Sequence, residues 1–143
     1  MNSKLCLWLV TLLFSALVLA ACGGQPVSAE GYGTAEFMEE LRAKGAEPET
    51  GDALQQPFFS VTGSTINIGD ESIQVFEYDS AETMESDAVL VDANGSSIGT
   101  SMVSWVATPH FYKKGRILVL YVGDHTETLE LLESVLGPQF AGR

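Results

Sequence analysis

The chain has 143 residues, enough for one globular domain and too few for two comfortable ones. Its 19 acidic and seven basic side chains give a formal net charge of −12, which excludes broad attraction to nucleic acid because a phosphate backbone needs Lys and Arg to neutralise it. An apolar fraction of 45% excludes a disordered chain, and two cysteines are too few for a disulfide scaffold.

Residues 1–24 have the three parts of a secretory signal. Lys4 is the positive charge of the first part, and the apolar run of 17 residues that follows contains only two that are not apolar, Thr11 and Ser15. Such a run is at the short end for a membrane span, and small residues close it. The segment is therefore typical of a signal for secretion.

The C-terminal end of this segment carries a motif that is more specific than a general secretory signal. Leu19-Ala20-Ala21-Cys22, followed by two glycines, resembles the lipobox of bacterial lipoproteins. The resemblance implies diacylglycerol transfer to the Cys22 thiol, cleavage before Cys22 and, often, acylation of the new N-terminus. Two or three acyl chains on one residue hold a soluble domain at a bilayer without a transmembrane helix. The alternatives are an uncleaved N-terminal helix and an ordinary cleaved signal.

Processing at this site would divide the chain into three parts. Residues 1–21 are the signal peptide, residues 22–34 are the lipidated Cys and a flexible tether rich in Gly, Ser and Pro, and residues 35–143 are a single domain. The mature chain would have six basic and 19 acidic side chains, a charge of −13. With Cys6 removed and Cys22 lipidated, the domain has no thiol for nucleophilic or metal chemistry.

Two helices and three strands are predicted in the first half of the domain. A helix begins at Thr34 and places Phe37 and Leu41 on one face, and residues 46–57 then form a loop. A short strand at 58–61 precedes a hairpin with strands at 64–68 and 72–78. A second helix runs from Asp79 to Val91, because Asp79 and Glu82 have the spacing of a capping box.

The second half repeats this pattern. Extended segments are predicted at 102–106 and 110–112, with a turn at 113–116. Residues 117–122 are six apolar residues without interruption, which predicts a central strand buried on both faces. A last helix begins at Asp124 and ends at Gly137. The resulting order α-ββ-α-ββ-α favours an α+β fold, a mainly antiparallel sheet with helices packed on it.

The body of the chain also carries a resemblance. The stretches Gln56–Val61, Trp105–Gly123 and Leu136–Pro138 resemble small, uncharacterised bacterial envelope proteins. The resemblance covers most of residues 35–143. It implies no activity and no site residue.

The sequence predicts no catalytic, cofactor or metal site. The acidic clusters lie on predicted polar helix faces, or in a turn in the case of Asp70 and Glu71. The two histidines, His110 and His125, are 15 residues apart and match no metal-binding spacing, and no Gly-x-Ser-x-Gly or phosphate loop is present. His125 is expected to be exposed near the start of the last helix.

One segment, residues 105–116, combines aromatic and basic side chains. Its candidate ligand-binding residues are Trp105, His110, Tyr112, Lys113, Lys114 and Arg116. An aromatic wall with a basic rim suits an anionic or sugar-like ligand or a lipid head group. The other interpretation is a hairpin whose aromatics belong to the core and whose charges keep an exposed turn soluble.

These observations predict a lipid-anchored binding or interaction domain on the extracytoplasmic face of the cell membrane or outer membrane. It would perform no chemistry and use no cofactor. Its partners would be the membrane, through the lipid on Cys22, and an unknown envelope protein or small ligand. The alternatives are an envelope enzyme or enzyme subunit that uses His110, favoured by a pocket beside that residue, and a purely structural envelope component, favoured by a fully packed aromatic segment.

Overall fold

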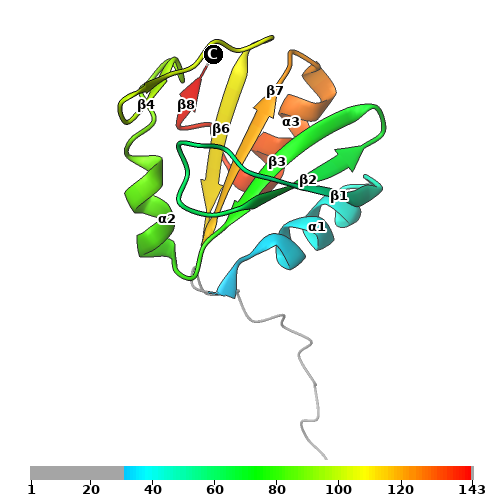
Figure 1. Ribbon diagram of the computed structural model, residues 1–143. Helices are drawn as coiled ribbons and strands as arrows, with labels where there is room; N and C mark the ends of the chain where they lie inside the picture. The colour runs from blue at the N-terminus through cyan, green and yellow to red at the C-terminus, as the bar shows by residue number, and fades with distance from the viewer. Residues whose placement is uncertain (1–30, 143) are drawn as a thin grey trace, which may run out of the picture.

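An antiparallel sheet of six strands, in the order β1-β2-β3-β7-β6-β8, runs through the computed structural model, which describes residues 31–142 (Figure 1). Its strands are β1 (Pro48–Leu54), β2 (Gly63–Ile68), β3 (Glu71–Glu77), β6 (Pro109–Lys114), β7 (Ile117–Val122) and β8 (Ala141–Gly142). A separate small hairpin consists of β4 (Ser97–Ile98) and β5 (Ser101–Met102).

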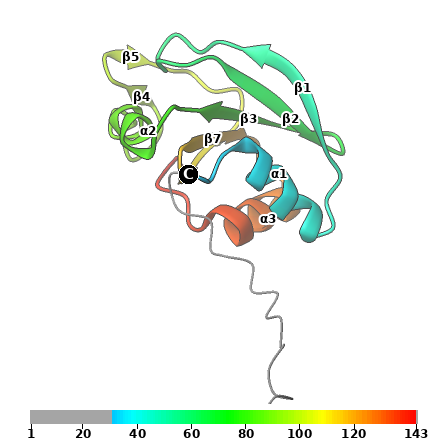
Figure 2. The same cartoon turned by 90° about the horizontal axis from the view of Figure 1, so that it is seen from below.

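Helices cover both faces of this sheet. α1 (Thr34–Ala43) and α3 (Thr126–Leu136) pack together on one face, and α2 (Ala81–Ala88) lies on the other (Figure 2). The predicted α+β class, with a mainly antiparallel sheet and helices packed on it, is confirmed. The predicted order of elements is found, with β1, β8 and the β4–β5 hairpin added to it. Within the described range, every helix is too short or too polar to cross a membrane.

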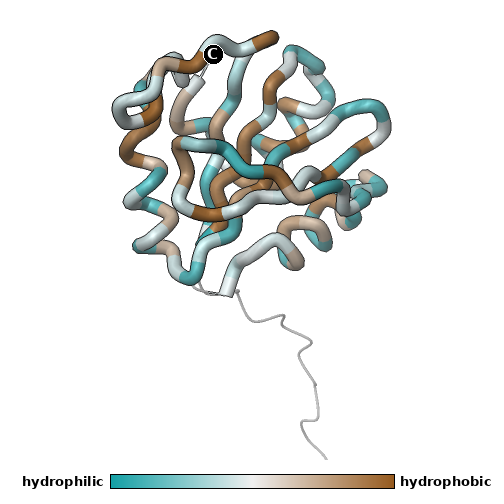
Figure 3. The backbone as a smooth tube through the Cα atoms, viewed as in Figure 1, coloured by the Kyte–Doolittle hydropathy of each residue, from teal (hydrophilic) through white to brown (hydrophobic). Residues whose placement is uncertain are grey.

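β7 is the central strand, between β3 and β6. Ile117, Val119 and Tyr121 pack beneath α1 and α3, whereas Leu118 and Leu120 pack on the side of α2. All five side chains are fully buried, which confirms the prediction of a strand buried on both faces. Figure 3 shows apolar residues gathered in this middle part of the sheet and hydrophilic ones in the turn between β2 and β3.

β1 occupies residues that the hydropathy pattern assigned to a loop, so the loop predicted at 46–57 is wrong. The strand contains Pro, Gly and two acidic residues, and only Pro48 is buried. It lies at the edge of the sheet, and a bulge between Thr50 and Ala53 interrupts its pairing with β2. Backbone hydrogen bonds hold this strand, and a hydropathy pattern does not register them.

The segment predicted as a strand at 58–61 forms a turn instead. Phe59 packs on Phe76 with ring centroids 4.7 Å apart. Ser60 donates hydrogen bonds from its backbone N–H and its hydroxyl to the Asp87 carboxylate of α2, at 2.7 and 2.8 Å. Because that N–H is bonded to a side chain, it is not available to a strand ladder, and the aromatic residues pack the turn onto the sheet.

Two boundaries in the second half also differ from prediction. β6 continues to Lys114, so the turn predicted at 113–116 is limited to Gly115 and Arg116, where Gly115 has φ 57°. Of the extended segment predicted at 102–106, only Met102 belongs to a strand.

The described chain enters at one end of the sheet. Tyr32, expected in the tether at 22–34, is buried, and its carbonyl oxygen accepts a hydrogen bond of 3.0 Å from the backbone N–H of Arg116 in the β6–β7 turn. The β2–β3 turn and the connection from β7 to α3 lie at the opposite end (Figure 1). Strands of six residues separate the two ends by roughly 20 Å. The predicted signal peptide and the predicted lipidation site, Cys22, lie outside the described residues.

Candidate functional site

The six candidate side chains in residues 105–116 are divided between the two faces of the sheet. Tyr112 and Lys114 face α1 and α3, whereas Lys113 faces α2. Trp105 packs with the cluster on the α2 side, and Arg116 lies in the turn between β6 and β7. The alternation of a β-strand therefore separates side chains that are neighbours in the sequence.

The aromatic members of this segment pack into the core. Tyr112 is 2% exposed, and burial raises its pKa to about 12, with a further rise from the Glu133 carboxylate. The Trp105 ring is half-buried and packs edge-to-face on Phe58 and Phe111, while its indole N–H donates to the Gly95 carbonyl at 2.6 Å. Trp105 and Tyr112 do not share an exposed groove.

Each cation of the segment is paired with a carboxylate. The pairs are Lys113 with Glu85 of α2 (2.6 Å), Lys114 with Glu40 of α1 (2.8 Å) and Arg116 with Glu77 of β3 (2.5 Å). The Lys114 ammonium also donates to the Val135 carbonyl at the end of α3, at 2.9 Å. These cations connect the sheet to its helices, so the expected basic rim has no uncompensated charge to offer an anion.

His110 is a buried connection between strands. Its Nδ1 lies 2.6 Å from Oε1 of Gln139, whose amide nitrogen donates to the Gly142 carbonyl at 2.9 Å. That second bond fixes the amide oxygen toward His110, so Nδ1 carries the proton. Nε2 is buried without a hydrogen-bond partner in the described part of the chain. A pocket beside His110 would favour the enzyme interpretation. His110 lines neither of the two hollows described below.

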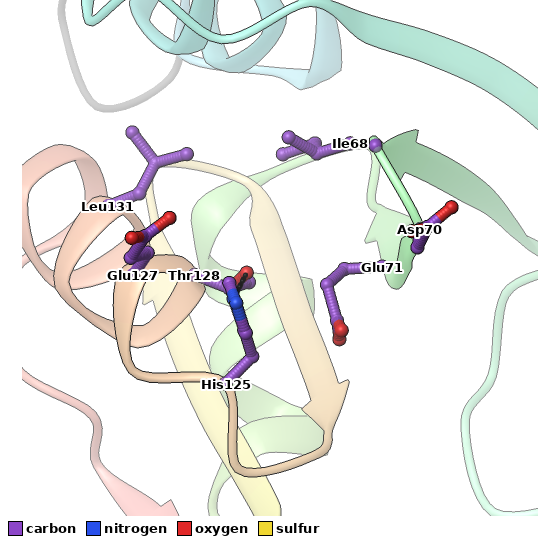
Figure 4. Close-up of a pocket in the computed structure, with 8 residues that line it drawn as sticks. Ile68, Asp70, Glu71, His125, Glu127, Thr128 and Leu131 are labelled. Atoms are coloured by element: carbon purple, nitrogen blue, oxygen red, sulfur yellow. Dashed lines mark hydrogen bonds between the residues drawn. The ribbon is translucent and has the colours of Figure 1, made fainter.

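A hollow lies at the end of the sheet opposite the entry of the chain. It has a volume of about 460 Å³ and is built by the end of β2, the β2–β3 turn and the first turns of α3; its lining residues are Ile68, Gly69, Asp70, Glu71, His125, Glu127, Thr128 and Leu131. In Figure 4 the carboxylates of Glu71 and Glu127 lie on different sides of the hollow, and Asp70 points outward. A smaller hollow of about 210 Å³ adjoins it at Gly69.

Hydrogen bonds fix several lining residues of the larger hollow. The Tyr121 hydroxyl donates to Oε2 of Glu71 at 2.5 Å and accepts from the backbone N–H of His125 at 3.3 Å. His125, exposed as expected, is held by a 3.0 Å contact between its Nδ1 and the Thr128 hydroxyl. These bonds join β3, β7 and the start of α3, so the lining is preformed.

The hollow carries negative charge without counter-ions. Asp70, Glu71 and Glu127 form no ion pair with any residue in the range 31–142, and neither do Glu47 and Glu49 at the smaller hollow. Glu127 lies in the first turn of α3. The arrangement offers several anionic acceptors to a ligand and no aromatic ring among its lining residues.

The sequence pattern predicts these acidic residues in an exposed turn and on a solvated helix face. What brings them together is the antiparallel pairing of β3 with β7, in which Ile73 lies opposite Tyr121. This register places the start of β3 beside the end of β7, and hence Glu71 beside the start of α3. The sequence shows one acidic cluster before the strand at 72–78 and a second after the strand at 117–122. It does not specify that these two strands pair.

Comparisons with known proteins leave the site to be interpreted from its own geometry. No family model, curated protein or solved structure matches the chain. Across residues 31–142, no three side chains of His, Cys, Asp or Glu are grouped so that they could hold a metal ion.

Proposed function

We propose that this chain is a lipid-anchored, extracytoplasmic binding domain of the bacterial cell envelope, which performs no chemistry and binds cationic groups in the hollow between the β2–β3 turn and α3. The observation that carries the proposal is the set of unpaired carboxylates around a preformed hollow of about 460 Å³. Sites for small ligands commonly have volumes of about 300–1,000 Å³.

The lining residues favour one kind of cation. Glu71 and Glu127 supply oxygen acceptors, which suit the N–H groups of an ammonium or guanidinium. A quaternary ammonium instead favours aromatic faces, and the lining has none. Ile68 and Leu131 provide apolar contact for the alkyl stem of such a ligand. The proposed ligand is therefore an amine, a polyamine or a Lys or Arg side chain of a partner protein.

The position of the hollow supports this role. The chain leading from the lipobox reaches the domain at Tyr32, next to Arg116, while Glu71 lies at the other end of β3. A lipid on Cys22 would therefore be joined to the domain at the end opposite the hollow, which leaves the hollow accessible to soluble ligands or other envelope proteins. The paired cations of residues 113–116 lie at the end near the anchor.

Replacing both carboxylates of the hollow tests this proposal. Glu71→Gln with Glu127→Gln is expected to weaken spermidine binding at least tenfold, because each lost charged hydrogen bond contributes about 1.5–3 kcal/mol and 1.4 kcal/mol is tenfold. The measurement is isothermal titration calorimetry of the lipidated protein in non-ionic detergent. Choline, which has the charge but no N–H donor, is expected to bind at least tenfold more weakly than spermidine.

The matched control is Glu39→Gln with Glu82→Gln, which changes the net charge equally at two exposed positions outside the hollow. It is expected to leave the Kd for spermidine within about twofold. Equal weakening by the two double variants would show that spermidine responds to overall charge, and the hollow would lose its assigned role.

A further inference from the structure

Tyr121 contacts both walls of the hollow without lining it. Its ring is fully buried on the face of the sheet beneath α1 and α3. Its hydroxyl donates to Glu71 at the start of β3 and accepts from the backbone of His125 at the start of α3. Burial raises the pKa of Tyr121, and the bond to Glu71 raises it further, so the hydroxyl keeps its proton and remains a donor.

His110 and Gly123 fix the position of the Tyr121 ring and of its hydroxyl. His110 stacks on its ring with centroids 6.1 Å apart and planes inclined by 24°, and His110 is itself fixed by Gln139. The hydroxyl passes over Gly123, where a Cβ would lie 2.5 Å from the hydroxyl oxygen. Only glycine leaves room for the hydroxyl at this point, so the position of the Tyr121 hydroxyl depends on Gly123.

We propose that Tyr121 is the positioning residue of the hollow. Its hydroxyl donates a hydrogen bond to Oε2 of Glu71 and so leaves Oε1 to face the ligand. The hydrogen bond that it accepts from His125 fixes the distance between the first turn of α3 and Glu71. The inference rests on the proposed function, since it assigns the residue that orients the acceptor for a cationic N–H group. Tyr121 itself is fully buried and does not touch the ligand.

Tyr121→Phe removes the hydroxyl and keeps the ring. It is expected to raise the Kd for spermidine at least threefold in the lipidated protein, because the Glu71 carboxylate is then free to rotate away. Gly123→Ala displaces the same hydroxyl by a different route and is expected to have the same effect. The control is Tyr78→Phe, which removes a similar bond, from a buried tyrosine to Asp87 at 2.9 Å, on the other face of the sheet.

Tyr78→Phe is expected to lower the melting temperature by a similar amount and to leave the Kd within twofold. A second readout does not depend on any ligand: the ¹³C chemical shift of the Glu71 carboxyl carbon is expected to move in Tyr121→Phe and to stay unchanged in Tyr78→Phe. An unmoved shift would overturn the positioning role, whatever spermidine does.

The binding results separate this inference from the proposed function. If Glu71→Gln with Glu127→Gln weakens binding while Tyr121→Phe and Tyr78→Phe do not differ, the hollow binds cations and the positioning role is wrong. If the wild-type protein does not bind spermidine, both are wrong. Loss of affinity in Tyr121→Phe and Gly123→Ala, with Tyr78→Phe unchanged, supports both.

Discussion

Leu120→Ala is expected to lower the free energy of unfolding by about 2–5 kcal/mol, the range for a large-to-small change in a packed core. Leu120 is fully buried in the central strand, on the face that packs with α2. Neighbouring strands on both sides limit how far the structure can close around the lost methyl groups. Urea denaturation of the protein in non-ionic detergent, followed by far-ultraviolet circular dichroism, measures the change.

Leu90→Ala is the matched control for this substitution. Leu90 is 45% exposed, so the same chemical change is expected to cost no more than about 0.5 kcal/mol. If Leu120→Ala cost less than about 1 kcal/mol, β7 would be peripheral or half exposed, contrary to its position in the sheet.

Cys22→Ala is expected to abolish lipidation and leave an unprocessed precursor. The lipobox resemblance makes the modified thiol the group that the processing enzyme recognises, and alanine has no thiol to receive a diacylglycerol. Metabolic labelling with palmitate and intact-mass measurement of the membrane fraction report both steps. Cys6→Ala is the control, because Cys6 lies in the predicted signal peptide and its loss is expected to leave labelling and cleavage intact. Acylation and cleavage before residue 22 in Cys22→Ala would rule out the lipobox.

The parts of the fold that follow from local hydropathy were predictable. The uninterrupted apolar run at 117–122 identified the central strand, because a short apolar run between turn residues is typical of a strand buried on both faces. The alternation around Ile66 and Ile73 likewise identified the β2–β3 hairpin, whose register pairs these two residues. Phe37 and Leu41, one helical turn apart, form the buried face of α1.

The parts that depend on hydrogen bonds between distant segments were not predictable. β1 has an edge position and a sequence of turn-forming and acidic residues, so its strand character comes from β2. Phe58 and Phe59 have strand propensity, but the bond from Ser60 to Asp87 holds their segment in a turn. Tertiary contacts outweigh local propensity in both cases.

The candidate residues in 105–116 are separated in the structure for a related reason. Aromatic and basic residues gathered in one stretch suggest a surface, yet a strand sends alternate side chains to opposite faces, so Lys113 and Lys114 meet different helices. In the acidic hollow, by contrast, residues that are distant in the sequence lie at the same site. Glu71 and Glu127 are 56 positions apart, and the pairing of β3 with β7 brings them together.

The central claim, that the hollow binds a cationic N–H group, is tested most directly by mapping spermidine onto the wild-type protein. Titration of the ¹⁵N-labelled protein in non-ionic detergent, followed by amide chemical shifts, locates the contact without any substitution. We expect saturable shifts at residues 69–71 and 125–128, with the shifts of residues 105–116 unchanged. Shifts centred on residues 105–116, or a weak response spread over all acidic surfaces, would contradict it.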